Sequence, residues 1–141
     1  MPAYYRKLHG YKYQLMEAYI HNIDIREYEI DTPYLKLNKD GMLEIGKGYA
    51  WDGPSGPTID TLNFMRGSLL HDALYQLIRM EKIPYSCKDH ADRLLQRTCI
   101  EDGMSKFRAW YVYQAVKWFG AEAARPGSEI PDEIICVPET P

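Results

Sequence analysis

The sequence predicts an α+β fold in which antiparallel strands come first and three helices follow. Over residues 11–50, apolar and aromatic residues alternate with polar ones, and this period of two is typical of strands. Over residues 65–120, apolar residues recur at helical spacing. Residues 46–60 hold four glycines and two prolines, which exclude a regular helix, so a shaped loop is expected there. We therefore predict a single domain over 1–125, followed by an extended, acidic, proline-rich tail over 126–141.

The clearest strand signal is a hairpin. Residues 34–37 and 42–45 are two short alternating runs, joined by the turn Asn38-Lys39-Asp40-Gly41. Gly41 supplies the positive φ that such a turn usually requires. In the loop that follows, Tyr49 and Trp51 are the expected anchors.

Three helices are expected, over 65–80, 87–101 and 105–119. Ser86 and Ser105 are the expected N-caps of the second and third, and a glycine follows each of these two helices. The third is apolar over a wide arc, so we expect it to be buried or to lie at an interface.

Charge and cysteine content exclude several classes of protein. The formal net charge is −3, and no basic block interleaves with aromatic residues, so nucleic-acid binding is not expected. The three cysteines form no CxxC or CxxH motif, which is typical of reduced thiols rather than of a zinc knuckle. No apolar run has the length of a signal peptide or of a transmembrane segment.

The candidate site centres on His71 and Asp72, an adjacent ionisable pair inside an otherwise apolar helix. A buried ionisable group without a partner is unfavourable by several kcal/mol. A metal, a charge partner or a water-filled cleft must therefore compensate it. His71 and Tyr75 are four residues apart and share a helix face, whereas Asp72 points about 100° away.

The second helix offers carboxylates to this imidazole. Asp89 and Asp92 are three residues apart, and if the two helices pack antiparallel, one of them can reach His71. Asp92 is the better candidate, because an acid in the first turn, such as Asp89, is expected from the helix dipole alone.

These residue types can form a metal-assisted hydrolytic site. A histidine oriented by a buried carboxylate is a competent general base, so His71 is the candidate base, with Asp92 and Tyr75 beside it. Asp72 and oxygens of the loop would hold a hard cation, calcium rather than zinc. The candidate loop ligands are Asp52 and Gly53, and the candidate oxyanion-binding residues are Gly53, Ser55 and Gly56.

A structural role is the alternative for the same residues. His71 and Asp72 can hydrogen-bond the loop and fix the helix, as buried polar residues often do, with Tyr75 as ordinary core. Residue types alone leave both readings open.

The stretch 48–120 resembles a phage and prophage family known as domain of unknown function 1353, and the likeness covers about half of the chain. It implies a phage or prophage origin. We accordingly expect a protein of the host cytoplasm, or one associated with the virion. The likeness rests on four segments, which are Gly48-Tyr49-Ala50-Trp51-Asp52-Gly53-Pro54-Ser55, His71-Asp72-Ala73-Leu74-Tyr75, Ala91-Asp92 and Ser105-Lys106-Phe107-Arg108-Ala109-Trp110.

A second, more local likeness concerns the chemistry. His-Asp-x-x-Tyr on one helix, with an aspartate on the next, is similar to bacterial secreted calcium-dependent phospholipases that cleave the sn-2 ester. This likeness implies that His71 is the base, that Asp72 binds calcium, and that Asp92 and Tyr75 orient the imidazole. The chain departs from those lipases in lacking their disulfide pattern and in its residues 1–45.

Three functions follow from these observations. The first is a calcium-dependent hydrolase of ester or amide bonds in host lipid or envelope, with lipid and peptidoglycan as candidate substrates. The second is a non-catalytic phage structural or tail-associated protein, or a homo-oligomer. The third is a metal-dependent phosphohydrolase, which would need further histidine ligands, whereas His9 and His21 lie in expected strands.

Overall fold

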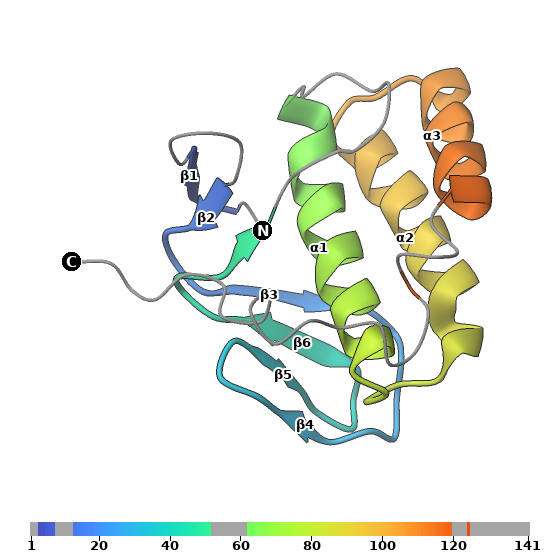
Figure 1. Cartoon of the computed structure of the whole chain (residues 1–141). Helices are drawn as coiled ribbons and strands as arrows, with labels where there is room; N and C mark the ends of the chain where they lie inside the picture. The colour runs from blue at the N-terminus through green and yellow to red at the C-terminus, as the bar shows by residue number, and fades with distance from the viewer. Residues whose placement is uncertain (1–2, 8–12, 52–61, 120–123, 125–141) are drawn as a thin grey trace. The chain divides into compact units, whose positions relative to one another are not determined.

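The computed structural model describes residues 3–7, 13–51, 62–119 and 124. It confirms the α+β class, with antiparallel strands in two sheets followed by three helices (Figure 1). The described residues fall into two compact units, one of strands up to residue 51 and one of helices from residue 62. The predicted tail and the predicted loop beyond Trp51 lie outside the described residues, and the single domain over 1–125 stays a prediction.

The first sheet has the order β1-β2-β7 and is antiparallel throughout. Tyr13 lies opposite Trp51 in the register, and the rings of Tyr5, Tyr13 and Trp51 pack with centroids 5.6–5.7 Å apart. The prediction of an irregular loop over 46–60 was therefore wrong at its start, because Ala50 and Trp51 pair with a distant strand. The strands are β1 (Tyr5–Lys7), β2 (Tyr13–Leu15) and β7 (Ala50–Trp51).

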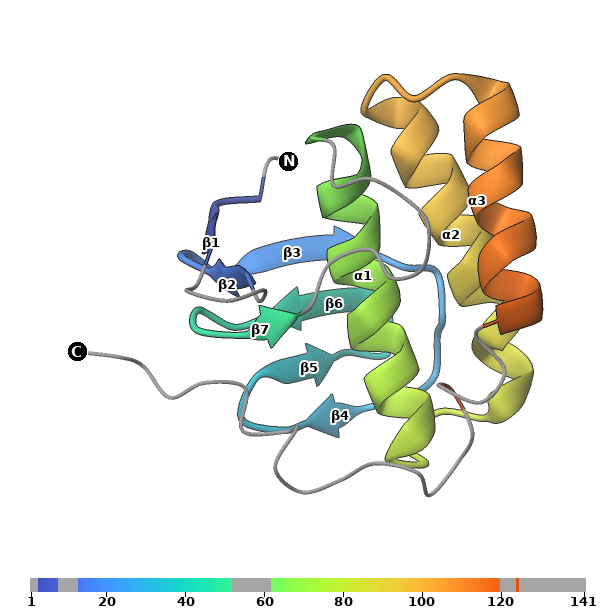
Figure 2. The same cartoon turned by 45° about the horizontal axis from the view of Figure 1, so that its top comes forward.

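The second sheet contains the predicted hairpin and has the order β3-β6-β5-β4 (Figure 2). Buried leucines and isoleucines alternate with exposed Lys36 and Glu44 along β5 and β6, which explains the period of two. At the turn, Gly41 has φ 88°, and the Asn38 side-chain oxygen accepts the N–H groups of Asp40 and Met42 at 2.9 and 3.0 Å. The strands are β3 (Tyr19–Asn22), β4 (Ile30–Asp31), β5 (Leu35–Leu37) and β6 (Met42–Ile45).

The three helices are α1 (Leu62–Arg79), α2 (Lys88–Glu101) and α3 (Lys106–Phe119), all within three residues of the predicted bounds. Ser105 caps α3 as predicted, since its hydroxyl accepts the N–H of Arg108 at 3.2 Å. The prediction that Ser86 caps α2 was wrong, because a short 3₁₀ turn (Tyr85–Cys87) contains Ser86 and moves the helix start beyond it.

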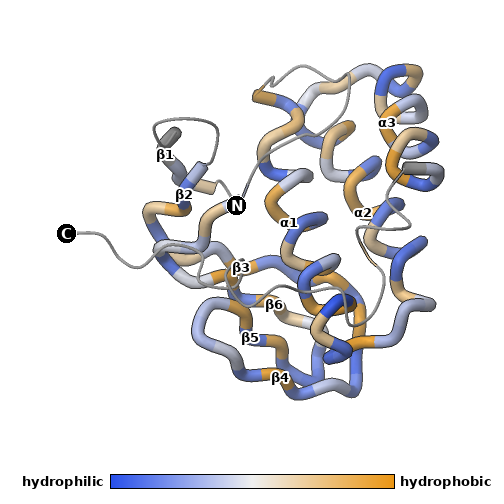
Figure 3. The backbone as a smooth tube through the Cα atoms, viewed as in Figure 1, coloured by the Kyte–Doolittle hydropathy of each residue, from blue (hydrophilic) through white to orange (hydrophobic). Residues whose placement is uncertain are grey.

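The helices pack as antiparallel neighbours around an apolar core. Arg66 near the start of α1 binds Glu101 and Asp102 at the end of α2, each with an N–O distance of 2.9 Å. Hydrophobic and hydrophilic segments alternate along α1 and α2, as the spacing of a half-buried helix requires (Figure 3). The core between the helices includes Phe64, Leu95, Cys99, Met104, Ala109 and Val112.

The third helix is only partly buried, although it is apolar over most of its surface. Ala109 and Val112 belong to the core, while several large aromatic side chains of α3 face solvent. None of the helices described is long and apolar enough to cross a membrane.

Candidate functional site

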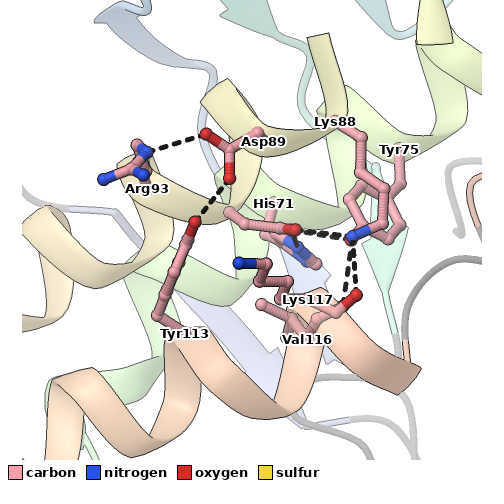
Figure 4. A network of polar contacts seen from close by, with 9 residues as sticks. His71, Tyr75, Lys88, Asp89, Arg93, Tyr113, Val116 and Lys117 are labelled. Atoms are coloured by element: carbon pink, nitrogen blue, oxygen red, sulfur yellow. Dashed lines mark hydrogen bonds and ion pairs between the residues drawn. The ribbon is translucent and has the colours of Figure 1, made fainter. Parts of the chain in front are cut away.

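Asp92 is the centre of a buried polar cluster in the helical unit. Figure 4 shows the side chains of His71, Tyr75 and Lys88 from this cluster. The side chain of Asp92 is 0% exposed. Oδ1 accepts hydrogen bonds from His71 Nε2 at 2.7 Å and from the Tyr75 hydroxyl at 2.6 Å. Oδ2 accepts one from Lys88 Nζ at 2.7 Å. The structure thus brings together His71, Tyr75 and Asp92, three of the candidate residues, although their catalytic roles stay predictions.

Helical spacing explains how these side chains meet. His71 and Tyr75 are one turn apart on α1, and their ring centroids lie 4.0 Å from each other. Lys88 and Asp92 are likewise one turn apart on α2. Because α1 and α2 are antiparallel, the middle of one helix faces the middle of the other, and three polar side chains converge on the carboxylate of Asp92.

Sequence reasoning assigned no role to Lys88, and the structure makes it the cation of the cluster. Besides Asp92, its ammonium donates to the carbonyls of Val116 and Lys117 at 3.3 Å. These carbonyls belong to the last turn of α3, where intrahelical donors run out and the helix dipole is negative. Lys88 therefore connects all three helices. The sequence feature that could have indicated this role is the four-residue spacing between Lys88 and Asp92, which places them on one helix face.

The protonation states follow from burial and partners. Burial, the largest influence on Asp92, raises its pKa, but the hydrogen bond and the electrostatic attraction from His71, with hydrogen bonds from Lys88 and Tyr75, outweigh it and hold the pKa below the ordinary value. Burial, together with the hydrogen bond to Asp92, raises the pKa of Tyr75 far above its usual range. At neutral pH the carboxylate is ionised, the phenol is protonated, and the ammonium of Lys88 balances the charge of Asp92.

The tautomer of His71 follows from this network. An ionised carboxylate can only accept, so Nε2 of His71 must carry the proton in the bond to Asp92. In the neutral imidazole, the lone pair then resides on Nδ1. His71 is 8% exposed, so the ring is mostly but not completely enclosed. The arrangement holds one nitrogen as a fixed donor and leaves the other as a base.

The proposed metal ligands are only partly described. Asp72 is half-buried on α1, and its charge contributes to the raised pKa of Tyr75. Within the described residues, no group of three or more His, Cys, Asp or Glu side chains is arranged to hold a metal. The other candidates, Asp52, Gly53, Ser55 and Gly56, lie outside the described residues. Among the described residues, Asp72 is thus the one proposed ligand of the ion, and carboxylate oxygens are ligands that calcium takes.

Asp89, the carboxylate ranked second from the sequence, belongs to a different cluster. It accepts a hydrogen bond from the Tyr113 hydroxyl on α3 and one from Arg93 Nε at 2.7 Å. The hydrogen bond from Tyr113 is the main reason why the pKa of Asp89 is lowered. This cluster ties α2 to α3 near the surface, away from the imidazole.

Comparison with known proteins gives no match, whether to a family model, to a curated protein or to a solved structure. The resemblance to the phage and prophage family stays a prediction.

Proposed function

We propose that this protein is a hydrolase in which His71 is the general base. The observation that supports this proposal is the hydrogen bond that orients the imidazole of His71. Its Nε2 donates at 2.7 Å to a fully buried, ionised Asp92. Such a bond fixes both the tautomer and the orientation of the ring, which a base needs in order to act at a defined point. Tyr75 supports the same oxygen of Asp92 and packs against the ring.

In the proposed reaction, Nδ1 of His71 removes a proton from a water molecule while the water oxygen attacks an ester or amide carbonyl. The carbonyl π electrons move to the oxygen, and a tetrahedral oxyanion forms. As this intermediate collapses, His71 returns the proton to the departing oxygen or nitrogen, so that an alcohol or an amine leaves. Asp92 stabilises the imidazolium between the two steps, although Lys88 already balances part of its charge.

Calcium is part of this proposal. Asp72, with Asp52 and the backbone of Gly53, would hold the ion, and Gly53, Ser55 and Gly56 would line the oxyanion position. A bound calcium ion would polarise the carbonyl and stabilise the oxyanion. The candidate substrates are ester and amide bonds of host lipid and peptidoglycan.

The decisive variant is His71→Gln. The Nε2 of glutamine can replace the imidazole donor to Asp92, but its amide is not basic. We expect activity on phospholipid or ester substrates to fall by about two to four orders of magnitude, with the free energy of unfolding lowered by about 1 kcal/mol at most. Tyr75→Phe is the matched control, because it removes another donor to Asp92 and leaves the base in place. Equal loss of activity in both variants would contradict a base at His71.

Calcium binding is tested separately by calorimetry with calcium and then zinc, on the wild type and on Asp72→Asn. We expect calcium to bind the wild type and to bind the variant more weakly, because one anionic ligand is lost. Unchanged affinity in Asp72→Asn would remove Asp72 from the proposed site.

A second function is favoured by a different property of the same cluster. Its charges balance, each member has a partner, and it links three helices, which is typical of a buried polar network that specifies packing. In a non-catalytic phage structural or tail-associated protein, this network would hold the helices in place. In that case His71→Gln would affect only unfolding, and no substrate would be turned over. No observation favours the phosphohydrolase alternative.

A further inference from the structure

The outward face of α3 carries four large aromatic side chains that the fold leaves exposed. Phe107, Trp110, Tyr111 and Trp118 are 77%, 50%, 47% and 71% exposed, respectively. At about 100° per residue, all four fall within an arc of about 100°. The rings of Phe107 and Trp110 lie near each other, with centroids 6.2 Å apart. We call these four residues the α3 aromatic face.

The charged side chains of α3 itself have one sign. The helix contains Lys106, Arg108 and Lys117 and no acidic residue, so its side chains sum to +3. By the same helical spacing, both lysines border one edge of the arc, and Arg108 lies beyond the other edge. The ammonium of Lys117 lies 6.0 Å from the ring centroid of Trp118, so cation and aromatic group are presented together.

The opposite side of the helix is held firmly. Ala109 and Val112 pack in the core, and Lys88 binds the carbonyls of the last turn. Exposing a large aromatic side chain forgoes about 2 kcal/mol of burial, so four on one face indicate a surface that is covered by a partner. Because the helix is fixed, it would present this face without rearrangement.

We propose that the α3 aromatic face docks on the surface of an anionic phospholipid bilayer, with α3 lying in the plane of the interface. Tryptophan, tyrosine and phenylalanine insert at the level of the headgroups, and flanking lysine and arginine bind anionic lipid. A second copy of the same face is a poorer partner, because two helices of charge +3 would be opposed. The net charge of −3 over the whole chain does not prevent docking, since screening over about 8 Å leaves the local charge dominant.

This inference does not depend on the proposed hydrolysis. If both hold, the face would bring the enzyme to a lipid substrate. His71→Gln should abolish turnover and leave bilayer binding unchanged, so failure of one proposal is distinguishable from failure of the other.

The test is cosedimentation of the full chain with vesicles of phosphatidylcholine, alone and mixed with an equal part of phosphatidylglycerol. We expect binding to the mixed vesicles that weakens as salt is raised. Phe107→Ala/Trp118→Ala should lower the partition coefficient about tenfold or more, and Lys106→Gln/Lys117→Gln should lower it by a similar factor on the anionic vesicles. Tyr4→Ala, at an exposed aromatic residue of the strand unit, is the matched control and should bind like the wild type.

A second readout identifies which tryptophans enter the lipid. Brominated phospholipid should quench Trp110 and Trp118, whereas Trp51, which is 3% exposed, should keep its emission. Absence of binding, or equal binding by the aromatic double variant, would overturn the proposal. So would a dimer in sedimentation equilibrium that Phe107→Ala/Trp118→Ala dissociates, because the partner would then be a second copy.

Discussion

Lys88 and Asp92 show how a buried charge is made tolerable in this protein. A carboxylate with no exposed surface is unfavourable to ionise, yet Asp92 keeps its charge because three donors surround it, one of them the cation Lys88. The cation in turn depends on two carbonyls of α3. Asp92 and Lys88 thus both rely on groups from another helix, and removal of Lys88 leaves the carboxylate buried without a cation.

Replacing Lys88 by methionine tests this dependence. Lys88→Met keeps the length of the side chain but leaves Asp92 buried without its cation, so we expect the free energy of unfolding to fall by about 3–5 kcal/mol near pH 7. Urea unfolding measures the loss. The double variant Lys88→Met/Asp92→Asn should recover part of it, because no buried charge remains. A single variant as stable as the wild type would contradict a buried ion pair.

The pH dependence of the same pair has a definite sign. In the wild type, the pKa of Asp92 is lowered on folding, so its stabilisation is fully present above the ordinary value of 3.8 and is lost as pH falls through the folded pKa. In Lys88→Met, burial should dominate and raise that pKa instead. We therefore expect the difference in the free energy of unfolding between wild type and variant to become smaller as pH falls from about 7 toward 4, as measured by urea unfolding. A difference that becomes larger on acidification would contradict the ion pair between Lys88 and Asp92.

At the scale of elements, α2 packs so tightly against α1 at Gly67 that there is little space for a side chain there. A Cβ placed on Gly67 would lie 2.9 Å from Leu95 Cδ1 and 3.1 Å from Cys99 Sγ, with the carbonyl oxygen of Leu95 at 3.3 Å. Both neighbours are buried in the core. The glycine thus sets the distance between the two helices that bring His71 to Asp92.

A larger residue at this position should force the helices apart. We expect Gly67→Val to lower the free energy of unfolding by about 2 kcal/mol. Gly67→Ala should cost less, because alanine gains about 1 kcal/mol of helix propensity over glycine. Urea unfolding followed by circular dichroism gives both values. Arg97→Val, at an exposed position of α2, is the control for placing a β-branched residue in a helix without crowding a neighbour. It should lower the free energy of unfolding much less than Gly67→Val.

The elements that the sequence predicts well are those with local signals. The helices and the hairpin turn at Asn38 and Gly41 depend on periodicity and on turn residues that lie side by side in the chain. Strand β7 has no such signal, because Ala50 becomes a strand residue only by pairing with Gln14. The 3₁₀ turn that displaced the cap at Ser86 was missed for a similar reason, since no local pattern distinguishes it from a first helical turn.

The residues of the candidate site also divide into those that local sequence signals predict and those that depend on distant parts of the chain. The preference for Asp92 over Asp89 used helix position and the apolar pair Leu94-Leu95 that follows, both local signals, and Asp92 is the residue that contacts His71. The role of Lys88 depends on carbonyls 28 and 29 residues further along the chain. An isolated lysine at the start of a helix is ordinarily a surface residue, so its burial becomes visible only once α3 is in place.

Across the molecule, the three tryptophans divide between the two units. Trp51 is buried among the tyrosines of the first sheet, whereas Trp110 and Trp118 are exposed on α3. One fluorophore therefore reports on the strand unit and two report on the surface of the helical unit.

Iodide quenching of fluorescence should resolve these two populations. We expect Trp110→Phe/Trp118→Phe to remove nearly all quenchable emission and to leave a blue-shifted signal from Trp51. Trp51→Phe, the complementary control, should keep the quenchable part intact. Strong quenching of the remaining Trp51 in the double variant would show that the aromatic cluster of the first sheet is open to solvent.

Among the described strands, β4 forms one edge of the second sheet, which has a consequence for association with other chains. This strand is only two residues long, Ile30 and Asp31, and one of the two is charged. A foreign strand that approached this edge would find very few backbone groups to pair with, and would place its own side chains beside a carboxylate. The chain thus limits fibril-like growth from this edge by keeping its last strand short.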